Sequence, residues 1–106
     1  MGQTTNRRLQ LHEELCTILG SRNVYFQPPG TVRMNYPCIR YQRDRGQHTY
    51  ADNKTYIYRQ AYQLIYIDPN PDNDIVDELI DHFQEISFNR NYVADNLNHD
   101  VLTVYY

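Results

Sequence analysis

The segment 89–106 constrains the fold most, because it has the pattern of two strands joined by a polar turn. A run of Asp, Asn and His side chains ends at residue 100, and the apolar and aromatic residues 101–106 follow it. A closing segment of this kind is ordered when it is tied into a sheet. We therefore expect residues 101–106 to form a paired strand rather than a free tail.

Composition places the chain among small single-domain proteins. Its 106 residues predict one domain, 1–106, which buries roughly two-thirds of the surface of the unfolded chain. No apolar run is long enough to cross a membrane, and the first residues lack the apolar core of a signal peptide. Cys16 and Cys38 lie in a helical and a strand pattern, which predicts two reduced core residues and synthesis in a reducing cytoplasm.

Charge is distributed unevenly along the chain, and this matters more than the net charge of −3. Residues 22–59 include seven basic and two acidic residues, whereas residues 68–106 include one basic and nine acidic residues. Segments of opposite sign favour association with a partner. They do not indicate a polyanion-binding protein, because Asp44 and Asp52 interrupt the basic residues and the chain is acidic overall.

Hydrophobic periodicity predicts two helices and five strands. The helices are expected at 6–19 and directly after the turn 68–72, and the strands at 24–26, 36–43, 54–67, 86–92 and 101–106. The order α-β-β-β-α-β-β predicts an α+β fold, in which two helices pack on one face of a mainly antiparallel sheet. Residues 1–5 are expected to be flexible, and 44–53 to project as a loop.

Side-chain direction follows from these patterns at three places. In 54–67 the even positions, among them Tyr62 and Leu64, make one face aromatic and apolar. In 86–92 the alternation of Ile86, Phe88, Arg90 and Tyr92 predicts that these four side chains share a face. Arg7 and Arg8 lie at the positive end of the first helix, which is unfavourable. They are therefore either solvated or paired with another group.

No constellation of residues indicates catalysis or metal binding. The four histidines, His12, His48, His82 and His99, lack a metal-ligand spacing, and the four glycines form no phosphate loop. Neither serine lies in a nucleophile elbow, and Cys38 has the pattern of a core residue. The acidic run 68–74 lacks the glycine and distal glutamate of a calcium loop and is typical of a turn and helix cap. We expect no enzyme activity, no cofactor and no metal.

Four blocks of the sequence resemble proteins of tailed phages that infect Gram-positive hosts. The blocks are YPCIRY at 36–41, ADNK at 51–54, IDPNPD at 67–72 and FNRNYVADNLNH at 88–99. They resemble the tail terminators, also called tail-completion or minor tail proteins, over about residues 9–106. The resemblance implies a virion protein, made in the host cytoplasm, that forms a ring of usually six subunits at the head-proximal end of the tail tube. It also implies contacts with the major tail tube protein and the head connector, with DNA passing through the ring unbound.

The candidate functional residues are therefore interface residues. In the loop they are Arg43, Arg45 and His48, on the second helix Asp77 and Asp81, and in the last turn Asp95, Asn96, Asn98 and His99. The acidic helix residues are also candidates for the wall of a lumen that repels DNA. For the last turn a purely local role is the alternative, because Asp and Asn side chains bond to nearby backbone and tolerate left-handed geometry.

Two other functions remain open at this stage. One is a head-closure or connector-side adaptor, because neck proteins overlap in size and fold. The other is a small phage-encoded nucleic-acid-binding domain, which would show strong, salt-dependent binding to DNA. An enzyme would have to depend on Cys38 or His99.

Overall fold

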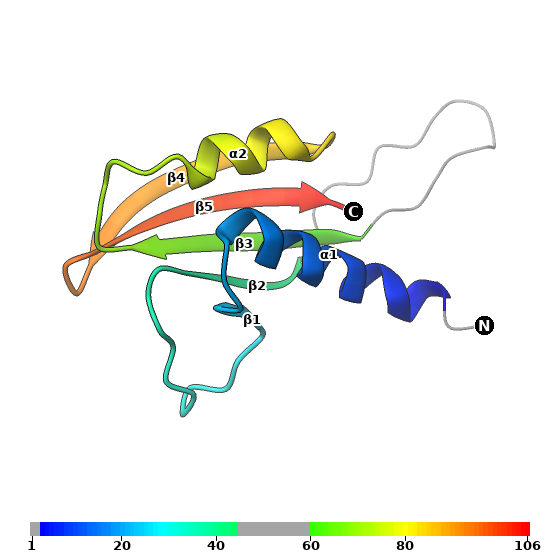
Figure 1. Ribbon diagram of the computed structural model, residues 1–106, viewed down its shortest axis with the longest axis horizontal. Coiled ribbons are helices and arrows are strands. Elements are labelled where there is room, and N and C mark those ends of the chain that lie inside the picture. The colour runs from blue at the N-terminus through cyan, green and yellow to red at the C-terminus, as the bar shows by residue number, and fades with distance from the viewer. Residues whose placement is uncertain (1–2, 45–59) are drawn as a thin grey trace.

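The computed structural model describes residues 3–44 and 60–106, with side chains from Arg7 onward (Figure 1). Its elements are α1 (Gln3–Leu19), β1 (Val24–Phe26), β2 (Cys38–Asp44), β3 (Ala61–Asp68), α2 (Ile75–His82), β4 (Ile86–Ala94) and β5 (Leu97–Tyr105). The predicted element order and the α+β class are confirmed.

The five strands form one mixed sheet in the order β1-β2-β3-β5-β4. β1 pairs in parallel with β2, and the other three pairs are antiparallel. The last strand is therefore central, hydrogen-bonded to β3 on one side and to β4 on the other. This confirms the expectation that the closing segment is tied into the sheet. It also makes the sheet depend on a pairing between residues far apart in the sequence.

Several element bounds differ from the predicted ones. α1 begins at Gln3, so residues 3–5, expected to be flexible, are helical; no glycine or proline stops the helix there. β5 begins at Leu97 instead of 101, because Asp95 and Asn96 adopt positive φ angles of 54° and 62°. Those angles allow a two-residue hairpin turn, which leaves the following residues free to pair. Residues 45–59, which include most of the predicted loop and the first six residues of the predicted third strand, lie outside the described residues.

The core lies on one face of the sheet, here called the helix face. Register places Tyr41, Leu64 and Leu102 in one row across β2, β3 and β5, and all three side chains are fully buried. They belong to a single apolar cluster with Leu15 of α1 and Leu79 of α2. The predicted aromatic and apolar positions of the third strand therefore face the core. In Figure 1, α2 runs along β4 and α1 lies toward the β1–β2 side.

The opposite face of the sheet, here called the open face, is the one on which the two helices do not pack. Its buried side chains include Cys38, Ile67 and Val101, none of which joins the cluster that holds the two helices. On β4 the register shifts between Phe88 and Arg90, which is a bulge at Asn89. The shift corrects the sequence prediction for this strand. Ile86 and Phe88 point to the helix face, and Arg90 and Tyr92 to the open face.

Arg8 is paired inside the fold rather than solvated. Its guanidinium donates to the hydroxyl of the buried Tyr41 at 3.1 Å and lies 4.3 Å above the ring of Phe26. The same hydroxyl lies 2.8 Å from Nδ1 of His12. Because Arg8 already donates to the hydroxyl oxygen, the hydroxyl proton is available to a neutral imidazole. Burial and the nearby Arg8 charge lower the pKa of His12 below 6.5.

This lowered pKa predicts a loss of stability in mild acid. The folded state disfavours protonated His12, so the unfolded state binds the additional proton as the pH falls below 6.5. The free energy of unfolding, measured by urea denaturation, should fall between about pH 7.5 and about pH 5.5. His12→Gln should show a smaller fall over the same interval. Equal falls in the two proteins would contradict the role assigned to His12.

Candidate interaction surfaces

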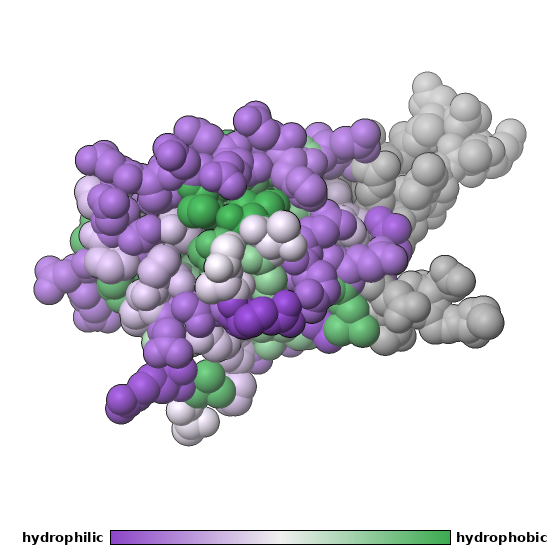
Figure 2. Space-filling view, in the orientation of Figure 1, coloured by the Kyte–Doolittle hydropathy of each residue, from purple (hydrophilic) through white to green (hydrophobic). Residues whose placement is uncertain are grey.

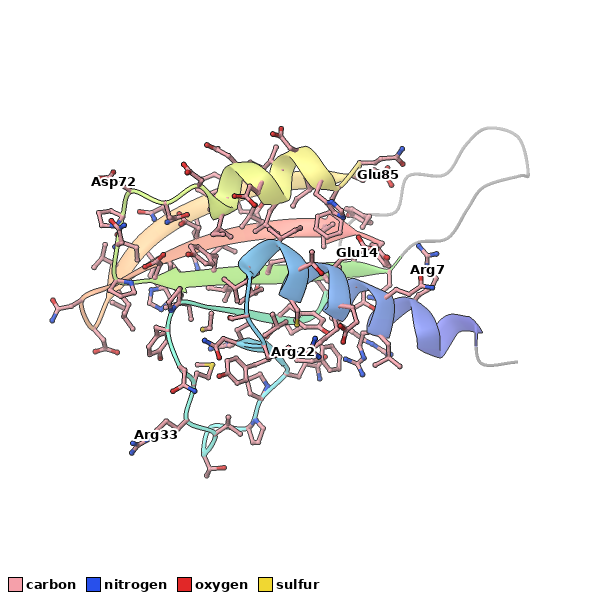
Figure 3. The ribbon with its side chains drawn as sticks, in the orientation of Figure 1. Arg7, Glu14, Arg22, Arg33, Asp72 and Glu85 are labelled. Carbon is pink, nitrogen blue, oxygen red and sulfur yellow. The ribbon has the colours of Figure 1, made fainter. Side chains whose placement is uncertain are left out.

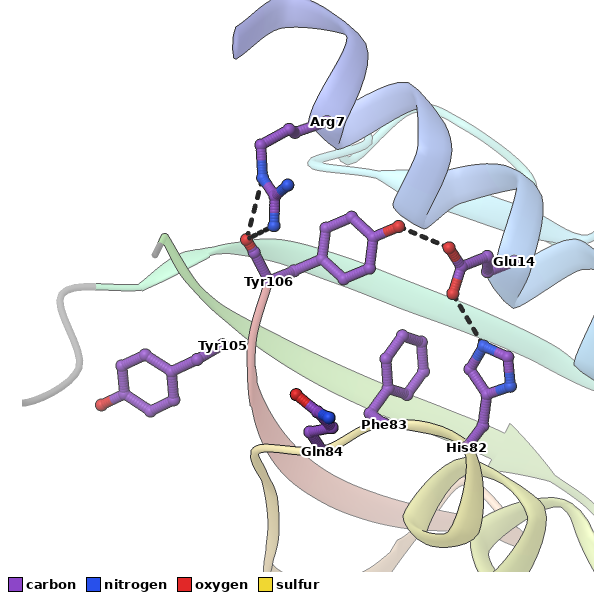
Figure 4. Close-up of a pocket in the computed structure, with 7 residues that line it drawn as sticks. All are labelled: Arg7, Glu14, His82, Phe83, Gln84, Tyr105 and Tyr106. Atoms are coloured by element: carbon purple, nitrogen blue, oxygen red, sulfur yellow. Dashed lines mark hydrogen bonds and ion pairs between the residues drawn. The ribbon is translucent and has the colours of Figure 1, made fainter. Parts of the chain in front are cut away.

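A pocket of about 220 Å³ lies where α1, the end of α2 and the end of β5 meet (Figure 4). The Glu14 carboxylate accepts a hydrogen bond from the Tyr106 hydroxyl and lies 2.7 Å from Nε2 of His82. Arg7 donates to the backbone oxygen of Tyr106 at 2.6 and 3.2 Å and lies 4.9 Å from the centre of its ring. These contacts therefore join both helices to Tyr106, the residue that follows the central strand.

The polar groups of this pocket bond to one another and to the backbone. Its lining residues are Arg7, Glu14, His82, Phe83, Gln84, Tyr105 and Tyr106, which include no serine, threonine or cysteine. Burial and the hydrogen bond with Glu14 raise the pKa of Tyr106 to about 12, so its hydroxyl stays a donor at neutral pH. The Glu14 carboxylate and the His82 imidazole pair with each other.

The acidic residues predicted on the second helix are at the surface. Asp77 and Asp81 are exposed and stand four residues apart on α2, so they share one side of the helix. Ile80 lies between them and is 40% exposed, whereas Leu79 on the inner side is fully buried. The outer side of α2 is thus an apolar residue flanked by two carboxylates.

The residues predicted in the last turn have local roles. Asp95 and Asn96 form the two-residue turn between β4 and β5. The Asn98 side chain donates to the backbone oxygens of Asp68 and Pro69, at 3.3 and 3.4 Å. His99 stacks on Tyr92 with ring centres 4.6 Å apart. These contacts are local roles of the kind that the sequence offered as the alternative to an interface, and the interface itself stays a prediction.

The residues predicted in the loop are only partly described. Arg43 lies on β2, exposed, and its backbone N–H donates to the Gln27 side chain at 3.1 Å. Arg45 and His48 lie outside the described residues. The structure does not bring Arg43 together with the last turn or with α2, since β3 and β5 separate β2 from β4.

Sequence reasoning missed a row of side chains on the open face, here called the arginine row. Register aligns Arg40 of β2, Ile65 of β3, Val101 of β5 and Arg90 of β4 across the sheet. Arg90 is exposed and Arg40 partly exposed. Within residues 7–44 and 60–106, neither arginine forms an ion pair with a carboxylate. No sequence signal locates this row, because it depends on the strand order and on the bulge.

The acidic run 68–74 forms a turn and a helix cap. Asp68 is buried and accepts hydrogen bonds from the Tyr66 hydroxyl and from the backbone N–H of Asn70. The Asn73 side chain accepts from the backbone N–H of Ile75, the first residue of α2. In the described parts of the chain no three His, Cys, Asp or Glu residues are grouped as metal ligands would be.

Both cysteines should be unreactive in the folded protein. Cys38 is fully buried and Cys16 nearly so, and burial raises the pKa of the Cys38 thiol to about 11. At about pH 8 roughly one Cys38 thiol in a thousand is then ionised, and that thiolate is buried away from the reagent. Ellman's reagent should label both thiols promptly in denaturant and neither in buffer. Cys16→Ser assigns the signals, and prompt native labelling of the remaining Cys38 would contradict its placement.

Comparisons with protein-family models, with curated proteins and with solved structures find no match for this chain. Neither described helix has the length and apolar composition that crossing a membrane requires.

Proposed function

We propose that this chain is a structural virion protein of a long-tailed phage, the tail terminator. In this role a ring of copies, six by the resemblance of the sequence blocks, sits on the head-proximal end of the tail tube. It stops addition of the tube protein and offers a surface to the head connector. DNA passes through the ring without specific binding, and the protein is not an enzyme.

The observation that carries this proposal is the separation of charge across the molecule. Arg33 and Arg22 lie at the side of β1 and β2, whereas Asp72 and Glu85 lie at the side of α2 and β4 (Figure 3). The α2 region also holds the carboxylates of Asp74, Asp77, Glu78 and Asp81. β2 itself holds Arg40 and Arg43. Arg90 on β4, Asp44 on β2 and Glu13, which pairs with Arg22, are exceptions to this separation.

Two unlike surfaces on one chain favour ring formation. When a patch of one copy meets a different patch of the next, the contact repeats and closes into a ring if the rotation per copy allows it. Opposite charges steer the two patches together and disfavour contacts between identical patches. The pocket supports a structural role as well, because its polar groups are engaged with one another.

Electron microscopy of lysates from a phage that lacks this gene tests the proposed function. Without a terminator, tube growth is not stopped, so we expect overlong, irregular tails without heads. Plasmid-supplied wild-type protein should restore tails of uniform length.

Two other outcomes would contradict the proposal in different ways. Tails of normal length, detached from DNA-filled heads, would assign the protein to the head side of the joint as an adaptor. Intact virions of ordinary appearance would exclude a neck function of either kind.

A further inference from the structure

We propose that copies of this chain associate by laying the outer side of α2 on the arginine row of the next copy. The proposal deepens the ring described above and rests on that function only for closure of the ring. The contact itself is argued from the side chains of the two surfaces. It pairs a carboxylate–apolar–carboxylate pattern with an arginine–apolar–arginine pattern.

The receiving surface is the arginine row. Ile65 is partly exposed at the centre of the open face, beside the buried Val101, and an arginine lies at each end of the row. Arg40 and Arg90 are separated by three strand spacings, about 14 Å. Arg90 is on this face only because of the bulge at Asn89, which reverses the side-chain direction of the residues after it. Bulges often serve to re-aim a side chain in this way.

The entering surface is the outer side of α2. The helix has eight residues, so it is about 12 Å long, close to the distance between the two arginines. Asp77 and Asp81 are one turn apart, and the exposed Ile80 lies beside both of them. In Figure 2 the hydrophobic surface of this side of the molecule lies between the two helices, and the surface over α2 is mainly hydrophilic. Ile80, 40% exposed, is therefore the apolar residue that the outer side of α2 offers to a partner.

Charge complementarity selects a second copy as the occupant. Arg40 and Arg90 lack carboxylate partners among the described residues, and the α2 carboxylates lie at the other side of the same chain. The long arginine side chains can reach inward from both ends of the row to Asp77 and Asp81, while Ile80 packs on Ile65. A helix laid on a sheet is also a common packing of two layers.

The two surfaces lie on opposite sides of the sheet, which fixes the kind of assembly. α2 packs on the helix face, whereas the arginine row is on the open face. Each copy therefore uses one surface for the copy before it and the other for the copy after it. Such head-to-tail contacts produce a ring or a filament rather than a closed dimer. Asp77 and Asp81 are then buried between subunits and do not line the lumen.

A charge-swap experiment on the purified full-length chain tests this contact by sedimentation velocity over a range of concentrations. Wild type should sediment as an oligomer. D77R/D81R and R40E/R90E should each shift the association midpoint to concentrations at least about tenfold higher, because like charges then face each other. An equimolar mixture of the two variants should assemble again, since each reversed surface meets its complement on the other variant.

Two control variants have the same changes in charge away from the contact. R33E/R43E matches R40E/R90E, and E13R/D72R, at two exposed carboxylates outside α2, matches D77R/D81R; both should sediment as wild type. Far-ultraviolet circular dichroism and urea midpoints check that every variant is folded. Restoration in the mixture cannot come from misfolded chains, so it separates the contact from loss of structure.

Three results would overturn the proposal. They are a wild type that stays monomeric throughout, swap variants that assemble as wild type does, and controls that lose assembly equally. If R40E/R90E assembles normally but loses binding to a labelled DNA oligonucleotide, the open face binds nucleic acid instead. The proposed function has its own readout, tail length in the gene-deleted phage, so either proposal can fail while the other stands.

Discussion

The rest of the structure depends on the pairing of β5 between β3 and β4. This strand supplies Leu102 and Val104 to the core and Val101 to the open face, so it is shared by both sides of the sheet. Beyond its end, Tyr106 is held by Arg7 and Glu14 of α1, which fastens the helix to the sheet. The arginine row would not exist without this pairing, because it sets the position of β4 beside β5.

The bulge at Asn89 gives the two faces their different character. Before it, Ile86 and Phe88 point to the helix face; after it, Arg90 and Tyr92 point to the open face. A strand without the extra residue would keep all four side chains on one face. The Asn89 side chain donates to the Thr103 hydroxyl at 2.7 Å, a contact that ties the bulge to β5. A single unpaired residue thereby turns Arg90 to the face that already holds Arg40.

Local patterns in the sequence predicted much of the fold, and long-range pairing accounts for what they missed. The element order, the strand at Val24–Phe26 and the inward direction of Tyr62 and Leu64 follow from periodicity, which is a property of neighbouring residues. Asp77 and Asp81 were found as an exposed acidic pair in the same way. The partners of Arg8, the parallel pairing of β1 and the arginine row join residues far apart in sequence. Periodicity does not reveal such contacts. The bulge at Asn89 also breaks the alternation from which the side-chain direction of Arg90 was predicted.

Cysteine cross-linking between copies tests the central claim, that opposite faces of this chain meet head to tail, most directly. Copies with Ile65→Cys and copies with Ile80→Cys are mixed and oxidised mildly, while the buried native thiols stay unreactive. Because a disulfide needs Cα atoms within about 7 Å, only neighbours in the proposed contact can link. We predict that the two variants form a dimer that a reducing agent dissociates. The control replaces Ile80→Cys with Val93→Cys, a change at a residue of β4 that is 65% exposed, and we predict no dimer from that pair. Equal cross-linking by both pairs, or by neither, would contradict the account.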